Sequence, residues 1–162
     1  MAENLFNSAH KHNSDKYVER WPKIFGRKEE ETMKIFSYGT LMSGMTRNFI
    51  MTDAGGKKTK DASLDGYRLY ANRDHPTMRE EEGHSVVGEL WEFDPAKKDK
   101  VIGYLDTIEG YPSYYTRKEI KIDGEDVLIY IMTDMAFDAQ VKMNEMNPVD
   151  SGDWKGHFLK KK

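Results

Sequence analysis

The turn Asp123-Gly124 separates two extended segments and predicts a β-hairpin. Asp-Gly is a preferred pair for the two-residue turns that link antiparallel strands, so we expect strands over 116–122 and 127–133. In the second segment, every residue from 128 to 132 is apolar, so the side chains on both faces of the strand would be apolar. This pattern is typical of a strand that is buried on both faces, as in the core of a barrel or sandwich.

Three further strands are expected earlier in the chain, over 33–38, 63–72 and 84–93. In the middle segment, Tyr67, Leu69 and Ala71 occupy every second position and so share one face of the strand. This alternation is typical of a strand with one buried face.

One helix has clear boundary signals between Asp94 and Gly110. Asp94 is a favourable N-cap, Pro95 suits the first helical position, and Gly110 suits the end of the helix. Between them runs an apolar stripe at helical spacing, formed by Val101, Leu105 and Ile108. Because strands outnumber helices, the expected fold class is α+β, with a small closed or strongly curved sheet and one long helix packed on it.

Residues 1–32 differ from the rest of the chain and are interpreted as a polar N-terminal extension, followed by one domain over 33–162. A helical stripe from Tyr17 to Phe25 is interrupted by Pro22, which weakens the helix prediction. We favour an extension that is partly ordered against the domain, and the alternative is a helix that binds a partner. The segment around Gly152 either closes the sheet or covers a pocket.

Composition excludes several classes of protein. With no cysteine, the chain has no disulfide scaffold and no thiol nucleophile, and its five histidines form no ligand pattern, so no metal site is expected. No stretch approaches the roughly 20 apolar residues of a membrane span, and the N-terminus lacks a signal core. The net charge of −3 gives no general attraction to nucleic acid, and the basic end is interpreted as a solubilising tail. We therefore expect a cytoplasmic protein that binds neither membrane nor nucleic acid.

Glu109 is the strongest candidate for a catalytic group. It lies on or beside the apolar stripe and in the last turn of its helix, where the helix dipole disfavours a carboxylate. Both effects should raise its pKa, which suits general acid/base catalysis. By spacing alone, an ordinary polar residue at a fraying helix end remains an open alternative.

A second carboxylate, Glu89, shares strand parity with Trp91 and Phe93 and so can point inward. We nevertheless favour a structural role for it, at the rim of the sheet or paired with an arginine such as Arg68 or Arg117.

The segment from Tyr38 to Leu41 ends a strand and enters a loop, where Gly39 would let backbone N–H groups approach an anion. Gly39 and Gly44 have the spacing of a phosphate-loop pair, but Met45 stands where that motif needs lysine. A nucleotide loop of this kind is therefore excluded.

Four blocks, in this order, resemble the γ-glutamylcyclotransferase-like family, including its γ-glutamylamine cyclotransferase and AIG2-like branches. They are residues 35–41, 66–70, 87–91 and 105–112, and the likeness covers roughly 33–135, so the extension has no counterpart. The resemblance implies a small six-stranded barrel-like mixed sheet with few helices and a cavity at its mouth. It implies that Glu109 is the acid/base and that no metal or organic cofactor is needed. It also implies a substrate site formed by Tyr38, Gly39, Thr40 and Leu41, with Tyr115 beside the pocket.

The activity implied by the resemblance is release of 5-oxoproline and a free amine from a small-molecule γ-glutamyl substrate. An alternative is a protein that keeps the fold but only binds a small metabolite or nucleotide, since a fold does not fix a function. A third possibility is that the extension and the basic end form an interaction surface. The sequence leaves the leaving amine and the oligomeric state open.

Overall fold

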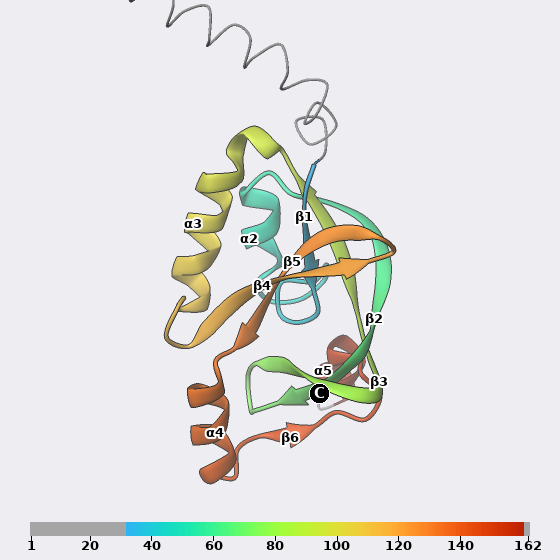
Figure 1. Ribbon diagram of the computed structural model, residues 1–162, viewed down its shortest axis with the longest axis vertical. Helices are drawn as coiled ribbons and strands as arrows, with labels where there is room; N and C mark the ends of the chain where they lie inside the picture. The colour runs from blue at the N-terminus through green and yellow to red at the C-terminus, as the bar shows by residue number, and fades with distance from the viewer. Residues whose placement is uncertain (1–31, 161–162) are drawn as a thin grey trace, which may run out of the picture. The chain divides into compact units, whose positions relative to one another are not determined.

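A single mixed sheet dominates the computed structural model, which describes residues 32–160 (Figure 1). Its six strands have the spatial order β4-β5-β1-β3-β2-β6. Only the pair β1 and β5 is parallel, and the other neighbouring strands are antiparallel. The strands are β1 (Met33–Ser37), β2 (Lys57–Ala71), β3 (Pro76–Phe93), β4 (Tyr115–Ile122), β5 (Glu125–Met132) and β6 (Asn147–Pro148).

Helices cover parts of this sheet. They are α2 (Asn48–Asp53), the 3₁₀ turn η1 (Pro95–Lys97), α3 (Lys98–Glu109), α4 (Asp134–Lys142) and α5 (Trp154–Lys160). Successive residues of β1 point to opposite faces, and so Ile35 and Phe36 join different apolar clusters. The cluster around Ile35 packs against α2 and α3, whereas the cluster around Phe36 includes Trp154 of α5.

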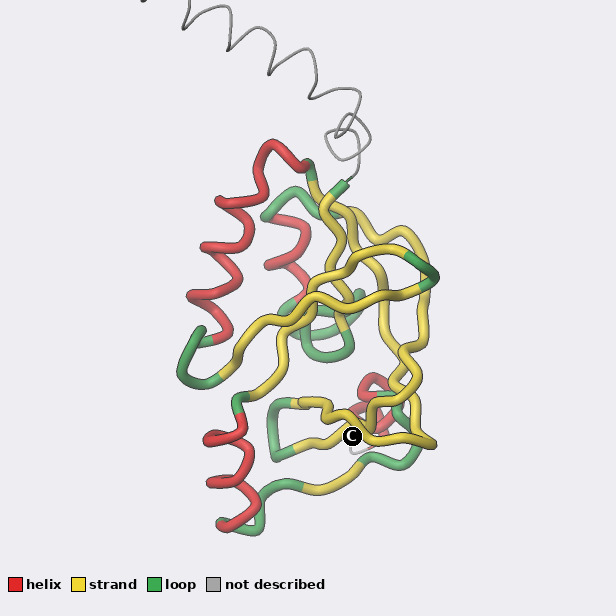
Figure 2. The backbone as a smooth tube through the Cα atoms, in the orientation of Figure 1, coloured by secondary structure: helices red, strands yellow, loops and turns green. Residues whose placement is uncertain are grey.

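The sheet curls into a half-barrel because its two long strands bend (Figure 2). Their pairing shifts register between Lys58 and Lys60 and again between Asp65 and Tyr67, and each shift is a β-bulge or irregularity. Gly66 lies at the second shift with a φ of 83°, a conformation that glycine adopts without steric cost. Bulges increase strand twist and bend, so they explain the curl.

The structure confirms the α+β class, the six-stranded mixed sheet and the hairpin at Asp123-Gly124. The second and third predicted strands are real but longer than expected, since β2 begins at Lys57 and β3 at Pro76. Asp94 does act as a cap, but its carboxylate accepts from the Ala96 N–H of the 3₁₀ turn that precedes α3. Helices α2, α4 and α5 were not predicted.

The C-terminal segment closes the sheet edge. Strand β6 pairs with β2, and the Gly152 carbonyl accepts a hydrogen bond from the Val87 N–H at 2.8 Å. Trp154 is buried in the cluster around Phe36 and does not line the cavity described below. Of the two alternatives for this segment, the structure therefore supports closing the sheet.

The predicted extension, including the stripe around Pro22, lies outside the described residues except for Thr32. The domain boundary therefore stays a prediction. None of the helices within residues 32–160 combines the length and apolar character that a membrane span requires.

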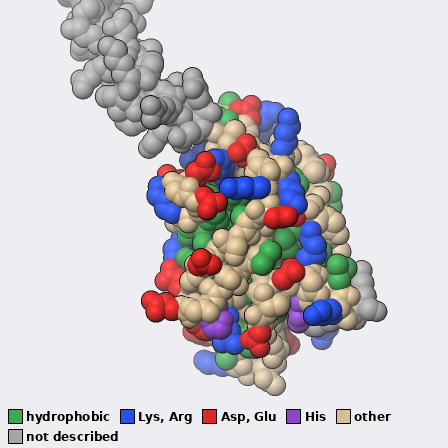
Figure 3. Space-filling model, turned by 90° about the vertical axis from the view of Figure 1, so that its right-hand side faces the viewer, with side chains coloured by type: hydrophobic (Ala, Val, Ile, Leu, Met, Phe, Trp, Pro, Cys, Tyr) green, Lys and Arg blue, Asp and Glu red, His purple; other side chains and the backbone are tan. Residues whose placement is uncertain are grey.

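Charged side chains are mixed in sign on the face shown in Figure 3. Lysines and arginines alternate there with aspartates and glutamates, so this face carries no broad basic surface. The expectation that the chain does not bind nucleic acid stays a prediction.

Candidate active site

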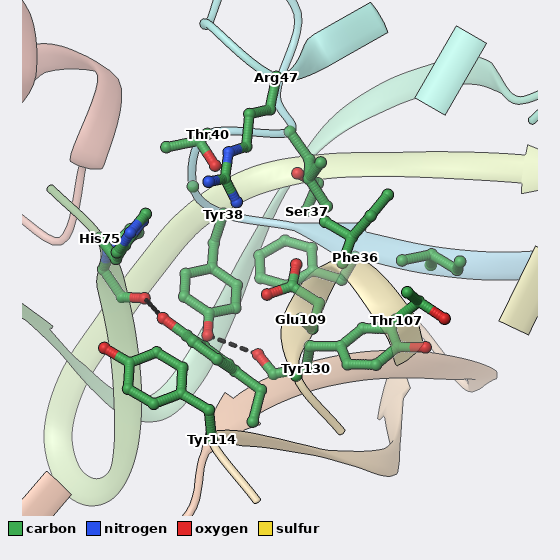
Figure 4. Close-up of a pocket in the computed structure, with 17 residues that line it drawn as sticks. Phe36, Ser37, Tyr38, Thr40, Arg47, His75, Thr107, Glu109, Tyr114 and Tyr130 are labelled. Atoms are coloured by element: carbon green, nitrogen blue, oxygen red, sulfur yellow. Dashed lines mark hydrogen bonds between the residues drawn. The ribbon is translucent and has the colours of Figure 1, made fainter. Parts of the chain in front are cut away.

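A cavity of about 330 Å³ opens where β1 ends and α3 ends (Figure 4). Its wall is formed by the end of β1, the loop that follows, the segment before β3, the C-terminal turn of α3 and the start of β4. The polar side chains of the wall are Ser37, Tyr38, Thr40, Arg47, His75, Thr107, Glu109, Tyr114, Tyr115 and Tyr130. All six residues predicted for the site (Tyr38, Gly39, Thr40, Leu41, Glu109 and Tyr115) line this one cavity.

Glu109 is the last residue of α3, and Gly110 ends the helix in the left-handed conformation with a φ of 68°. Figure 4 shows the carboxylate directed into the cavity. It forms no hydrogen bond or ion pair with any other residue of the described part of the chain. Burial raises its pKa to about 7, and the positive charge of Arg47 opposes this increase. The expectation of a raised pKa is thus supported, with burial as the main cause.

The turn that carries Glu109 is held by a polar network one helical turn earlier. Asp106 accepts two hydrogen bonds from the Arg117 guanidinium, at 2.9 Å and 3.1 Å. The Tyr130 hydroxyl donates to the same carboxylate at 2.8 Å. Since Arg117 and Tyr130 belong to β4 and β5, these bonds fix the end of α3 against the sheet, and bidentate pairs of this kind restrict orientation.

Two tyrosines form a rigid part of the wall. The Tyr38 hydroxyl donates to the Tyr130 carbonyl at 2.5 Å (Figure 4). The Tyr115 hydroxyl donates to the Pro76 carbonyl at 2.6 Å. Burial raises the pKa of both hydroxyls well above the ordinary value, so both are neutral donors near neutral pH.

In the loop after β1, backbone carbonyl groups accept hydrogen bonds from later residues of the same segment. The carbonyls of Gly39, Thr40 and Leu41 accept hydrogen bonds from Met42, Arg47 and Asn48. Within residues 32–160, no acceptor is bonded to the amide N–H groups of Gly39, Thr40 or Leu41. Free N–H groups on a cavity wall are able to bind an anion.

Gly39 is required by close packing rather than by an unusual φ angle. A Cβ atom at this position would lie 2.6 Å from Cγ of Pro76. Glycine thus lets the loop approach the segment that leads into β3.

Glu89 lies outside this cavity, and its predicted place at the sheet rim was wrong. Its side chain is only 2% exposed. The Ser43 N–H and hydroxyl donate to it at 2.7 Å and 2.5 Å, and the Trp91 indole donates at 3.2 Å. Burial opposes ionisation here, but the hydrogen bonds from Ser43, Lys58 and Trp91 outweigh it and lower the pKa to about 2.

The cationic partners of Glu89 are also not the predicted ones. Lys58 and Lys155 lie 3.1 Å and 3.3 Å from its carboxylate. Arg68 instead pairs with Glu81 and Asp150, and Arg117 pairs with Asp106. The structural role was expected, but lysines rather than an arginine supply the positive charge.

Arg47 and His75 line the cavity and were missed by the sequence analysis. Neither belongs to an amphipathic pattern, and each reaches the cavity from a loop. Burial and the nearby charge of Arg47 lower the pKa of His75. No group of three or more His, Cys, Asp or Glu side chains able to hold a metal occurs among the residues that the structure describes.

The described part of the chain is thus a curled half-barrel with a cavity in which the carboxyl group of Glu109 has no bonded partner among residues 32–160. The chain belongs to the gamma-glutamyl cyclotransferase, AIG2-like family, whose model matches residues 35–156. The resemblance drawn from the four sequence blocks is therefore confirmed.

Similar proteins come from distant organisms. A Methanocaldococcus jannaschii protein, provisionally named a gamma-glutamylcyclotransferase, is 28% identical over 88 residues, which are 54% of this chain and 70% of the relative. The crystal structure of an uncharacterised Pyrococcus horikoshii protein matches with a TM-score of 0.61 at 19% identity, over 80% of this chain and 96% of that one. The crystal structure of a mouse AIG2-like protein matches with a TM-score of 0.52 at 24% identity, over 65% of this chain and 79% of that one. Both structural matches bear on the fold alone.

Proposed function

We propose that this protein is a γ-glutamyl cyclotransferase, which converts a γ-glutamyl amine or peptide into 5-oxoproline and a free amine. The observation that carries the proposal is the carboxyl group of Glu109, which lies in the cavity, forms no hydrogen bond or ion pair with another residue of the described range 32–160, and has a pKa of about 7. A carboxyl group in this state both accepts and donates a proton near neutral pH, as general acid/base catalysis requires. Family membership supports the same activity.

In the proposed reaction, the α-amine of the γ-glutamyl group attacks its own γ-carbonyl carbon. A new C–N bond closes the five-membered ring, and the original amide C–N bond breaks. Glu109 accepts the proton that the attacking amine loses and then gives it to the departing nitrogen, so no other reactant is consumed. Positioned proton transfer of this kind contributes about 10²–10⁴-fold to the rate.

The cavity contributes by holding the substrate in the conformation that closes the ring. Fixing an intramolecular reaction in its reactive geometry lowers the barrier by up to roughly 7–11 kcal/mol. In this proposal the free amide N–H groups of Gly39, Thr40 and Leu41 bind negative charge on the substrate or on the developing oxyanion. Tyr38 and Tyr115 supply a fixed aromatic wall beside it.

The test is release of 5-oxoproline from a panel of γ-glutamyl amines and γ-glutamyl dipeptides. Wild-type protein, Glu109→Gln and the exposed-site control Glu119→Gln are assayed together, with circular dichroism to verify folding. We expect release by the wild type and the control, and a loss of at least about 10²-fold in Glu109→Gln.

Full turnover by Glu109→Gln would refute the role of Glu109. If folded wild-type protein released 5-oxoproline from none of these substrates, the activity itself would be wrong. The non-catalytic binding protein would then be the better interpretation.

A further inference from the structure

Arg47 presents a positive charge to the cavity. It precedes α2, and its side chain lines the cavity, where Figure 4 shows the guanidinium group directed inward beside Thr40. No acidic side chain of the described segment forms an ion pair with it. The groups that sense its charge are Glu109, His75 and Tyr115, all on the cavity wall. A half-buried guanidinium of this kind indicates that the ligand carries a negative group.

We propose that Arg47 binds the α-carboxylate of the γ-glutamyl group and thereby anchors the end of the substrate that every γ-glutamyl compound shares. This inference rests on the proposed function, because it assigns one contact of that substrate.

The first argument for the α-carboxylate is the position of Arg47 relative to the loop. The Arg47 N–H donates to the Thr40 carbonyl at 3.0 Å, so the backbone of Arg47 is fastened to the loop that contains residues 39–41. Figure 4 shows the guanidinium beside Thr40, and residues 39–41 line the same cavity, so the guanidinium lies next to the loop that carries these amide N–H groups. A planar guanidinium with neighbouring N–H donors matches the geometry of a carboxylate.

The second argument is the balance of charge in the cavity. Arg47 and His75 are the basic side chains among the residues that line it, and the lowered pKa of His75 leaves that ring neutral at neutral pH. The cavity thus offers one side-chain cation for one carboxylate. Every γ-glutamyl substrate has an α-carboxylate, whereas only some leaving groups carry a second one.

Such an anchor has a consequence for the chemistry. The α-amine and the α-carboxylate are attached to the same carbon atom, so fixing the carboxylate limits where the amine can lie. Arg47 would then hold the attacking nitrogen on the side of the cavity that Glu109 faces. It is therefore a positioning residue, not a proton carrier.

Binding of L-5-oxoproline and L-5-oxoprolinamide, measured by titration calorimetry, tests the anchor directly. The two ligands differ only in the group that represents the α-carboxylate, and neither has a leaving group. We expect wild-type protein to bind the acid about 10- to 100-fold more tightly than the amide, the effect of hydrogen bonds to a charged partner. Arg47→Met should lose this preference, and Arg47→Lys should regain part of it.

The control is Arg73→Met, which removes an exposed arginine that does not line the cavity. It should keep the wild-type preference for the acid. Retention of the full preference by Arg47→Met, or no binding of either ligand by the wild type, would overturn the proposal.

A kinetic comparison shows whether Arg47 binds the α-carboxylate of the γ-glutamyl group or a carboxylate on the leaving group. Arg47→Met should lower kcat/KM equally for γ-glutamyl-alanine and γ-glutamyl-alaninamide, because both keep the α-carboxylate. A loss confined to γ-glutamyl-alanine would mean that Arg47 binds the leaving group, and the proposal would be wrong. If wild-type protein releases no 5-oxoproline yet binds it in an Arg47-dependent manner, the cyclotransferase activity fails while the carboxylate contact stands.

Discussion

Replacing Glu109 with glutamine should stabilise the folded protein at alkaline pH. In the folded state Glu109 has a pKa of about 7, against an ordinary value of 4.5. Between these two values the unfolded chain ionises this carboxyl group while the folded protein still holds the proton, so wild-type stability falls as pH rises through this range. Each unit of difference between the pKa in the folded state and the pKa in the unfolded state corresponds to about 1.4 kcal/mol. The wild-type protein is therefore destabilised by about 3 kcal/mol at pH values above the folded-state pKa.

Glutamine resembles the protonated acid in shape and cannot ionise, so the variant avoids this cost. Urea unfolding of both proteins at a series of pH values measures the difference in the free energy of unfolding. Subtracting wild type from Glu109→Gln cancels the other titrating groups, and the remainder should grow by about 3 kcal/mol between pH 4.5 and about pH 8. Glu119→Gln, at an exposed site, provides the comparison. A difference that does not change with pH would refute the conclusion that burial holds Glu109 protonated.

Three further predictions concern other parts of the site. The acid limb of the pH profile of kcat/KM should lie near pH 7 in the wild type and shift upward in Arg47→Met, because the charge of Arg47 lowers the pKa of Glu109; an unchanged limb would contradict this coupling. Glu89→Gln should destabilise the fold by about 2–3 kcal/mol at neutral pH, since charged hydrogen bonds are lost, and chemical unfolding should show this deficit shrinking as pH falls toward the wild-type pKa of about 2. Gly39→Ala should cost about 1–3 kcal/mol in unfolding experiments and lower kcat/KM, because its methyl group would lie 2.6 Å from the ring of Pro76; wild-type values for both would show that the loop relaxes freely.

The local signals in the sequence were sufficient to locate strands β1 to β5, the turn and the main helix, but not the short strand β6. Asp123-Gly124 defined the hairpin, and Gly110 ends α3 in the left-handed conformation expected of such a glycine. The extra length of β2 and β3 could not be predicted, because neither added part shows a clear apolar alternation. Residues 57–62 of β2 are held by pairing with residues 88–92 of β3, and residues 76–80 of β3 by pairing with residues 67–71 of β2. Helix α5 likewise depends on burial of Trp154 by distant strands.

The partners of the site residues are harder to predict than the residues themselves. Strand parity indicated that Glu89 can point inward, but its donors lie 46 residues away at Ser43 and 66 residues away at Lys155. Arg47 reaches the cavity from a loop, where no periodic pattern indicates the direction of a side chain. Contacts of this kind follow from how the sheet curls, and not from the spacing of residues along one element.

Glu89 and Glu109 show how the same side chain takes on different chemistry in one small fold. Both are removed from bulk water, which by itself raises the pKa of a carboxyl group. Glu89 meets hydrogen-bond donors from four separate segments, and its pKa falls to about 2, so it remains ionised and ties the loop at Ser43 to the sheet. Glu109 accepts no hydrogen bond from any other residue within 32–160, and its pKa rises to about 7. The donors present, more than the depth of burial, thus determine which carboxyl group is a permanent anion and which is free to exchange a proton.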